Sequence, residues 1–249
     1  MCWSGEASTA VAAIGIGATA YAFVKKEPPA IWATLGYFTL MEVLQAATYL
    51  VIDDCASPAN QVLALLGYLH IAFQPLFINA FSLQFVPKPV RDRIAPWAYG
   101  LCFAAVIGML IQLYPFAWAG TCEVGLPLCG VQLCAASGNW HIAWDIPYNG
   151  LANALIGYPF VGSIGIPTYA AAAFWLPLLY GSWRVTLFHF LTGPTLAHLL
   201  TDNPNEWPAV WCLLSIGLIM IVVITPVRRR LHVERWPLWP RRWLKDMSA

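Results

Sequence analysis

Seven stretches of the chain are apolar over a length that predicts membrane-spanning helices, which need roughly 20 apolar residues each. Their approximate ranges are 7–24, 30–52, 60–86, 94–115, 164–182, 185–200 and 208–226. The first is built mostly of alanine and glycine, and the last contains the run LLSIGLIMIVVIT. The pattern therefore predicts an all-α membrane protein with seven transmembrane helices.

The chain between the fourth and fifth predicted spans has a different periodicity. The segment VQLCAASGNWHIAW alternates apolar and polar residues around a Ser-Gly-Asn turn, which predicts a short β-hairpin. Residues 151–163, LANALIGYPFVGS, are apolar but short, and Pro159 interrupts them. Two interpretations of this segment remain open: an interfacial or re-entrant piece, or an extension of the fifth span.

Composition supports the membrane assignment. Hydrophobic residues make up 59% of the 249 positions and charged residues only 10%. A soluble domain carries about 25% charged residues, so most of this chain is not expected to face water. The mean hydropathy of +0.64 agrees with that conclusion.

Basic residues predict the orientation. If the chain crosses seven times, all 13 lysines and arginines fall on one side, which the positive-inside rule makes cytoplasmic. The N-terminus is then outside and the C-terminus cytoplasmic, in a plasma membrane or a bacterial inner membrane. The Lys25-Lys26 pair follows the first apolar run, which favours an uncleaved anchor over a signal peptide.

The last residues, 231–249, form a tail rich in arginine and tryptophan beyond the seven-helix domain of residues 1–230. We expect it to lie along the anionic inner leaflet with its indoles at headgroup level. Positive-inside bias already accounts for its charge, so no nucleic-acid partner is expected. Membrane lipids are the expected partners.

The opposite side of the membrane carries acids without basic residues. Such a surface attracts cations, or its acids are simply solvated loop residues, and both interpretations remain open. The acids are Glu6, Asp53, Asp54, Glu123, Asp145, Asp202 and Glu206.

Cysteines concentrate on this outer side, where an oxidising environment permits disulfides. Cys55, Cys122, Cys129 and Cys134 lie in predicted outer loops. No C-x-x-C pair is present, so one or two disulfides that pin the hairpin are favoured over a zinc knuckle. The spacing does not determine which cysteines pair.

Two further cysteines lie near the outer ends of the terminal spans. Cys2 follows the initiator methionine, and Cys212 lies about one turn below the outer end of the seventh span. A disulfide between them would tie the terminal helices together, and joint ligation of a soft metal ion is the alternative. An N-terminal thiol nucleophile would lack a base adjacent in sequence.

Ionisable residues inside the predicted spans are the main candidates for function, because such groups are costly in a membrane unless they are partnered. Glu42 is the one acid of these spans, and His70 and His189 lie at a similar depth of roughly 15–18 Å. Helical spacing puts Gln45 on the face of Glu42, and Gln74 on the face of His70. His198 lies half a turn out of phase with His189, so both face one core only if Pro194 bends the helix.

This cluster has several open interpretations. Glu42 pairs structurally with His70 or Gln45, or Glu42, His70 and His189 bind a divalent metal such as Zn²⁺. A proton or ion relay and haem ligation by His70 and His189 are further alternatives. Additional polar candidates are Gln45, Gln74, His141, Asp145 and His198.

Five motifs carry a resemblance over nearly the whole chain: MCWSGEAS, MEVLQ, YLHIAFQP, HIAWDIPY and NEWPAVWCLLS. They resemble an uncharacterised family of seven-helix membrane proteins that opens with Met-Cys-Phe/Trp-Ser, which supports the fold and implies no reaction. A more remote similarity is to the alkaline ceramidase and adiponectin-receptor superfamily, whose members are zinc-dependent lipid amidases. Those proteins use a His-x-x-x-His pair, and this chain contains none.

Two function classes follow. The first is a metal-dependent hydrolase of a membrane lipid, with a site open to the outer face, metal-bound water as nucleophile and Glu42 as ligand or general base. The second is a non-enzymatic receptor or transporter for a metal ion, a cation or a small ligand. A retinal protein is excluded because the seventh span has no lysine for a Schiff base.

Overall fold

The computed structural model describes residues 3–157, 166–224, 226–240 and 243. Three of its helices are long and apolar enough to cross a membrane: α1 (Gly5–Val24), α3 (Pro58–Ser82) with the 3-10 turn that continues it (Leu83–Phe85), and α4 (Lys88–Gln112). A fourth long helix, α2 (Pro29–Thr48), lies between α1 and α3 in sequence. The expectation of a mostly helical protein that contains helices long and apolar enough to span a membrane is confirmed.

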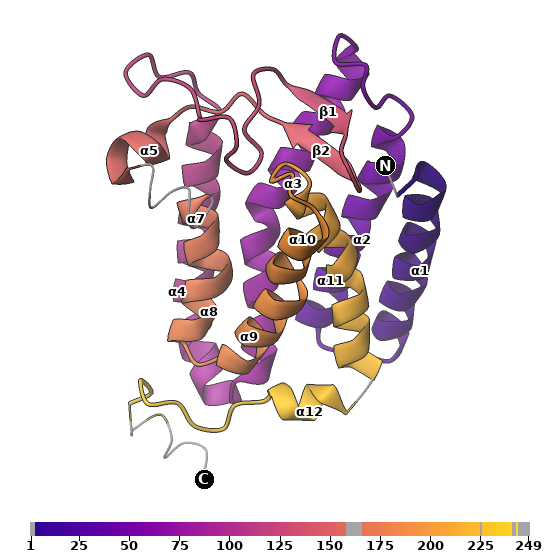
Figure 1. Ribbon diagram of the computed structural model, residues 1–249. Coiled ribbons are helices and arrows are strands. Elements are labelled where there is room, and N and C mark those ends of the chain that lie inside the picture. The colour runs from indigo at the N-terminus through magenta and orange to yellow at the C-terminus, as the bar shows by residue number, and fades with distance from the viewer. Residues whose placement is uncertain (1–2, 158–165, 225, 241–242, 244–249) are drawn as a thin grey trace.

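The second half of the chain is more broken (Figure 1). Helix α7 (Pro167–Ala170), a π-helical turn η2 (Ala171–Trp175) and α8 (Leu176–Leu179) follow one another directly. The predicted sixth span is two helices, α9 (Trp183–Thr192) and α10 (Pro194–Leu200), which meet at Gly193. Helix α11 (Trp207–Ile224) and the short α12 (Val227–Leu231) complete the bundle.

The break in the predicted sixth span has a local cause. Pro194 has no N–H to donate to the turn before it, but the first position of a new helix does not need that donor. Residue 194 accordingly begins α10. The chain is therefore bent at Pro194, as the sequence allowed.

Helices α1 and α2 pack closely through small residues. A Cβ atom added to Gly15 would lie 2.8 Å from Cγ2 of Thr39, and one added to Gly36 would lie 3.3 Å from Cγ2 of Thr19. Small residues that let two backbones approach are typical of helix pairs in membranes. The alanine and glycine content of α1 thus serves contact with α2.

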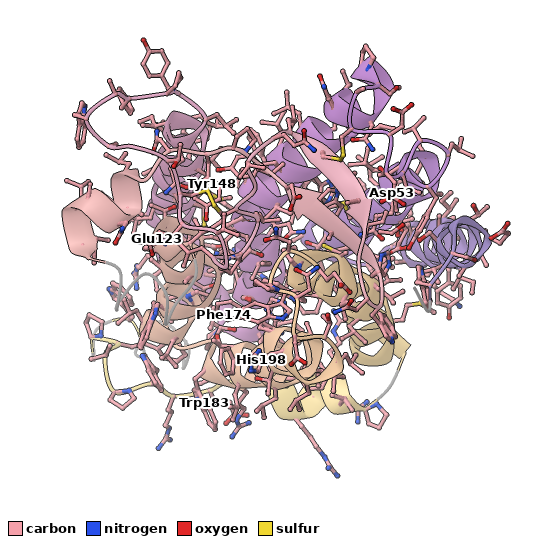
Figure 2. The ribbon with its side chains drawn as sticks, turned by 45° about the horizontal axis from the view of Figure 1, so that its top comes forward. Asp53, Glu123, Tyr148, Phe174, Trp183 and His198 are labelled. Carbon is pink, nitrogen blue, oxygen red and sulfur yellow. A yellow bond between two sulfur atoms is a disulfide. The ribbon has the colours of Figure 1, made fainter. Side chains whose placement is uncertain are left out.

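One end of the bundle, called here the hairpin end, carries a two-stranded sheet (Figure 1). Strands β1 (Cys134–Ser137) and β2 (Ile142–Asp145) pair antiparallel, with Cys134 opposite Asp145 and Ser137 opposite Ile142. The predicted hairpin is therefore confirmed. Asp53 lies beside it and accepts hydrogen bonds from the backbone N–H and hydroxyl of Ser137, both at 2.6 Å (Figure 2).

Two disulfides tie the hairpin region together, which confirms the prediction that disulfides pin the hairpin. Cys55 pairs with Cys134, and Cys122 pairs with Cys129. The first links the chain before α3 to strand β1, and Asn60 reinforces it with two hydrogen bonds to the backbone of Ala135. The start of α1 also lies at this end, because Trp3 N–H donates to the carbonyl of Trp140 at 3.0 Å.

The short helix α5 (Leu151–Ile156) follows the hairpin, and none of its residues is buried. It occupies the first half of the apolar segment 151–163, whose residues 158–163 lie outside the described part of the chain. Figure 1 shows α5 at the hairpin end, outside the bundle of long helices.

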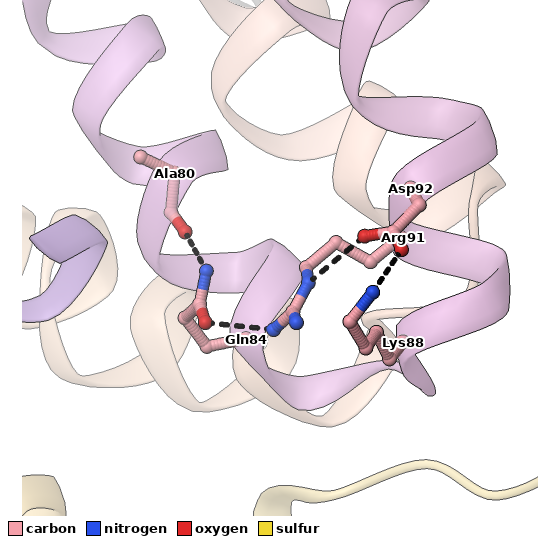
Figure 3. Close-up of polar contacts among 5 residues, drawn as sticks. All are labelled: Ala80, Gln84, Lys88, Arg91 and Asp92. Atoms are coloured by element: carbon pink, nitrogen blue, oxygen red, sulfur yellow. Dashed lines mark hydrogen bonds and ion pairs between the residues drawn. The ribbon is translucent and has the colours of Figure 1, made fainter. Parts of the chain in front are cut away.

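The opposite end, called here the basic end, holds the lysines and arginines of the described chain. They end α1, begin α4 and α9, and fill α12. Several are tied to neighbouring polar groups: Arg91 donates to Gln84 Oε1 at 2.8 Å, and Lys88 pairs with Asp92 at 2.6 Å (Figure 3). Arg228 pairs with Glu27 at 2.7 Å and so connects α12 to the α1–α2 turn.

The described part of the C-terminal tail packs against the basic end of the bundle, and the expectation that its indoles lie at headgroup level stays a prediction. Trp236 and Trp239 donate their indole N–H groups to the carbonyls of Leu179 and Tyr180, at 3.0 and 2.9 Å. These carbonyls end α8 and have no partner within that helix. Gly181 has a φ of +99°, and the chain turns there. A Cβ atom at this position would lie within 3.0 Å of both indole side chains.

Candidate functional site

A pocket of about 410 Å³, including its open mouth, lies between α2, α3, α9 and α11. Its lining is mainly apolar: Phe38, Ile78, Phe81, Val185, Phe188 and Ile219. Four polar residues complete it: Thr34, Ser82, His189 and Ser215. An apolar concavity with a few polar groups is the usual form of a small-molecule site.

The pocket lies in the half of the bundle nearer the basic end. Thr34 is five residues beyond the start of α2, which begins at the basic end, and Val185 is two residues beyond the start of α9. At 1.5 Å per residue these positions are within about 8 Å of the basic end. The pocket therefore lies away from the hairpin end.

Two hydroxyl groups of the lining are used within the protein. Thr34 donates to the carbonyls of Ala30 and Phe77, at 2.6 and 3.0 Å, and Ser215 donates to that of Trp211 at 2.9 Å. These bonds stabilise the helices and leave the imidazole of His189 and the hydroxyl of Ser82 as the polar groups of interest.

His189 is held on one side by aromatic rings. The indole N–H of Trp211 donates to Nε2 of His189 at 2.8 Å, and the centroids of the two rings are 5.1 Å apart. Phe174, from the π-helical turn, lies 5.4 Å from His189 and stacks on Trp211 at 5.5 Å. Because an indole only donates, Nε2 accepts, and the neutral imidazole carries its proton on Nδ1.

Gly193 makes room for this arrangement. A Cβ atom at this position would lie 2.6 Å from Nε1 of Trp211 and 2.8 Å from the carbonyl oxygen of His189. The break between α9 and α10 thus admits the indole that contacts His189. Sequence reasoning did not single out Gly193 or Trp211, although the Gly-Pro pair inside an apolar segment was a usable signal.

Glu42 is fully buried, and its partners come from α1 and its own helix. The Gln45 amide, oriented with its nitrogen toward the carboxyl group, donates to both oxygens at 3.2 and 3.3 Å. Ser8 lies beside the same carboxyl group, and Trp3 donates its indole N–H to the Ser8 hydroxyl at 2.9 Å. The predicted pairing with Gln45 is present, and this network connects the start of α1 to the bundle core.

His70 belongs to a stack of three rings. Tyr37 of α2 inserts between His70 and Phe77 of α3, with centroid distances of 3.9 and 3.7 Å. The Tyr37 hydroxyl donates to the His70 carbonyl at 2.6 Å. Nε2 of His70 is buried without a hydrogen-bond partner in the described part of the chain.

Gln74 and Cys212 are partners across the bundle. The Gln74 amide donates to the Cys212 sulfur at 2.9 Å and accepts from the Tyr169 hydroxyl at 2.7 Å. Cys212 is a free, buried thiol. The predicted Cys2–Cys212 disulfide is therefore wrong, because Cys212 is not disulfide-bonded. Cys2 itself lies outside the described residues.

The predicted metal site of Glu42, His70 and His189 is not assembled. Within the described ranges, no group of three or more His, Cys, Asp or Glu side chains could hold a metal ion. The physical reason is that Glu42 and His189 have partners of their own, a glutamine amide and an indole, and His70 stacks on Tyr37. The expected zinc ion thus finds no three-ligand site among these residues.

The remaining predicted polar residues lie apart from the pocket. His141 is buried in the hairpin, where Nδ1 accepts from the Ile142 N–H at 2.7 Å and contacts the Tyr49 hydroxyl at 3.2 Å. Burial lowers the pKa of His141 to about 3. Asp145 accepts from the amide of Asn205 at 2.7 Å. His198 is exposed and lies edge-on to Trp207 at 5.0 Å (Figure 2).

Glu206 is a structural residue that sequence reasoning left among the solvated acids. Its side chain is fully buried and accepts the backbone N–H groups of Asn139, Trp140 and His141, the last two at 2.8 and 3.0 Å. A Cβ atom on Gly138 would overlap this carboxylate. No spacing in the sequence connects Glu206 to the hairpin turn.

These features define the class of protein. It is a helical bundle with three described helices of membrane-spanning length and apolarity, a disulfide-linked hairpin at one end and an apolar pocket nearer the other. Residues 6–232 match a family of unknown function, DUF5765, and the chain belongs to that family. Neither the curated proteins nor the solved structures compared with the chain give a match. The similarity to the ceramidase superfamily stays a prediction.

Proposed function

We propose that this protein is a seven-span membrane protein that binds a hydrophobic small molecule in the pocket between α2, α3, α9 and α11. The observation that carries the proposal is the lining: six of the ten residues are large apolar side chains. This is the non-enzymatic alternative, since the described residues form no metal site for a hydrolase.

The proposed topology has the hairpin end outside and the basic end in the cytoplasm. Charge supports it, because lysines and arginines cluster at one end of the bundle, as the positive-inside rule requires. The two disulfides at the other end suit an oxidising exterior. The fifth span would be the run α7–η2–α8, which contains a π-helical turn, and the sixth would be a helix broken at Gly193.

The location of the pocket determines the class of ligand. With this topology the pocket lies in the cytoplasmic half of the membrane, where lipid chains are the most abundant apolar molecules. A polar metabolite would lose its hydration against Phe38, Phe81 and Ile219 without new hydrogen bonds. The expected ligand is therefore a lipid or another molecule with a long hydrocarbon chain.

Photo-crosslinking of protein in lipid nanodiscs tests this function. A long-chain probe with a diazirine near the chain end should label peptides from α9 and α11 and be displaced by unlabelled lipid. The Ile219→Trp variant, which fills the pocket, should lower labelling at least several-fold while its thermal transition is retained. Leu199→Trp is the matched control, because Leu199 is exposed on α10 and does not line the pocket. Equal labelling of both variants would contradict the proposal.

Membrane-impermeant thiol labelling tests the topology. After mild reduction, the reagent should reach Cys122 and Cys129 in intact cells, since both lie at the hairpin end. Labelling of these cysteines in inverted vesicles alone would reverse the orientation and put the pocket in the outer half of the membrane.

A further inference from the structure

We infer that His189 recognises the polar end of the ligand by donating a hydrogen bond from Nδ1–H to a neutral carbonyl oxygen. The inference rests on the proposed function and specifies its ligand class: a hydrophobic molecule that carries an ester, amide, ketone or quinone carbonyl. Three observations carry it: the tautomer of His189, the engagement of the Thr34 and Ser215 hydroxyls by backbone carbonyls, and the lack of a cation in the pocket lining.

The tautomer follows from the contact with Trp211. An indole N–H has no acceptor capacity, so Nε2 of His189 must present a lone pair across the 2.8 Å contact. A neutral imidazole then has its one N–H at Nδ1. No hydrogen-bond partner of Nδ1 occurs among the residues that the structure describes, so this donor is free for a ligand.

Two of the other polar groups of the lining do not compete for the ligand. The hydroxyl hydrogens of Thr34 and Ser215 are directed to backbone carbonyls. The imidazole of His189 thus offers an N–H donor in the pocket that has no assigned acceptor, beside the hydroxyl of Ser82. A polar donor in an apolar lining favours a ligand that brings one acceptor oxygen, because each unmatched polar group is costly to bury.

The acceptor is expected to be neutral. Among the described residues that line the pocket, none is a lysine or an arginine. A carboxylate or phosphate would therefore be buried without a compensating charge, at a cost that one hydrogen bond does not offset. An uncharged carbonyl oxygen has no such penalty.

The aromatic surroundings give His189 a defined orientation. Phe174 and Trp211 contact the imidazole at centroid distances of 5.4 and 5.1 Å, and Gly193 allows the indole to approach. Trp211 is thus a positioning residue: it fixes the tautomer without lining the pocket itself. This places the donor before the ligand arrives, which limits the ordering cost of binding.

Competition against the photo-crosslinking probe tests the inference with three competitors of equal chain length: a ketone, an alkane and a carboxylate. In the wild-type protein the ketone should compete about three- to tenfold better than the alkane, as one net hydrogen bond provides. His189→Phe should remove this preference and keep the affinity for the alkane. His189→Gln, which retains an N–H donor, should keep part of the preference.

The tautomer has a readout that is independent of ligand. Nitrogen-15 spectra of ring-labelled histidine should show His189 protonated at Nδ1, and Trp211→Phe should populate the Nε2-protonated form. A ketone preference that survives in His189→Phe would overturn the inference, as would an Nε2-protonated His189 in the wild-type protein. If the pocket holds no ligand at all, neither ketone nor alkane competes, and the proposed function fails instead.

Discussion

The carboxylate of Glu206 accepts the backbone N–H of His141 at 3.0 Å, although 65 residues separate the two in sequence. Glu206 directly precedes α11, and His141 directly precedes strand β2. The contact therefore connects the last long helix to the hairpin turn. It also satisfies three backbone donors that a tight turn leaves without partners.

Replacement of Glu206 by glutamine should destabilise the hairpin end. An amide keeps one acceptor oxygen but loses the charge that strengthens these bonds, so we expect a loss of about 1–3 kcal/mol in the free energy of unfolding. Chemical denaturation in detergent measures it. Glu123→Gln is the control, since Glu123 is an exposed acid of the same region. Equal stability of the two variants would show that the Glu206 carboxylate does not stabilise the hairpin turn.

Acidification should weaken the hairpin through His141. Its pKa is lowered from the usual 6.5 to about 3, so the folded protein binds fewer protons than the unfolded chain between these values. This contribution to stability is complete above pH 6.5 and is lost as the pH falls toward 3, at up to about 1.4 kcal/mol per pH unit. Stability measured between pH 7 and 5 should fall.

Two variants assign this pH dependence. His141→Asn keeps an acceptor near Ile142 N–H without a titrating group, so its stability should vary less with pH over the same interval. His232→Asn serves for comparison, because burial and nearby arginines also lower the pKa of His232 at the basic end. If the pH dependence of stability disappears in His232→Asn and persists in His141→Asn, the assignment to His141 is contradicted.

The two disulfides should contribute unequally. Cys55 and Cys134 are separated by 79 residues, whereas Cys122 and Cys129 are separated by seven. In the chain-entropy description, loss of the longer link costs about 4–5 kcal/mol and loss of the shorter about 2–3 kcal/mol. Thermal unfolding of the Cys55→Ser/Cys134→Ser and Cys122→Ser/Cys129→Ser proteins compares them. A larger loss from the second pair would show that strain or residual structure dominates.

Substitutions of Glu42 should separate hydrogen bonding from charge. Glu42→Gln keeps a polar group beside Ser8 and Gln45, so a change below about 1 kcal/mol is expected. Glu42→Leu leaves those partners buried without an acceptor and should cost about 1–3 kcal/mol. Val43→Leu, on the exposed side of α2, is the control. A severe effect of Glu42→Gln would indicate that the ionised carboxylate is required.

A methyl group at position 193 should displace Trp211. Gly193→Ala brings Cβ within 2.6 Å of the indole nitrogen, and overpacking of this kind typically costs about 1–3 kcal/mol. Thermal stability should fall, and so should the ketone preference of the pocket. Gly217→Ala on α11 is the matched control, because a Cβ there meets no atom within 4 Å. Unchanged stability of Gly193→Ala would mean that the indole can move at little cost.

Local pattern accounts for the features that the sequence predicted well. Apolar length predicted α1 to α4 and α11 to within about six residues, because an α-helix satisfies its backbone hydrogen bonds internally and needs few distant partners. Alternation around Ser137 and Asn139 predicted the hairpin for the same reason: the period of two is a local property of a strand. Glu42 and Gln45 were expected together because i and i+3 share a helix face.

The predicted site was less accurate because depth does not determine helix rotation. Glu42, His70 and His189 were expected at similar depths, yet each faces a different neighbour: Glu42 faces Ser8 and Gln45, His70 faces Tyr37, and His189 faces Trp211. Helical periodicity specifies which residues share a face but not which helix that face meets. The free thiol of Cys212 likewise depends on Gln74, which belongs to another helix.

The sequence by itself determined the helical class, the hairpin, the gathering of basic residues at one end and the oxidation of the cysteines near the hairpin. Each follows from composition or from contacts a few residues apart. The tertiary structure decided the disulfide pairs, the role of Glu206 and the pocket beside His189. Those features join residues far apart in the chain, and the rotation and packing of whole helices, together with the break at Gly193, bring them into contact.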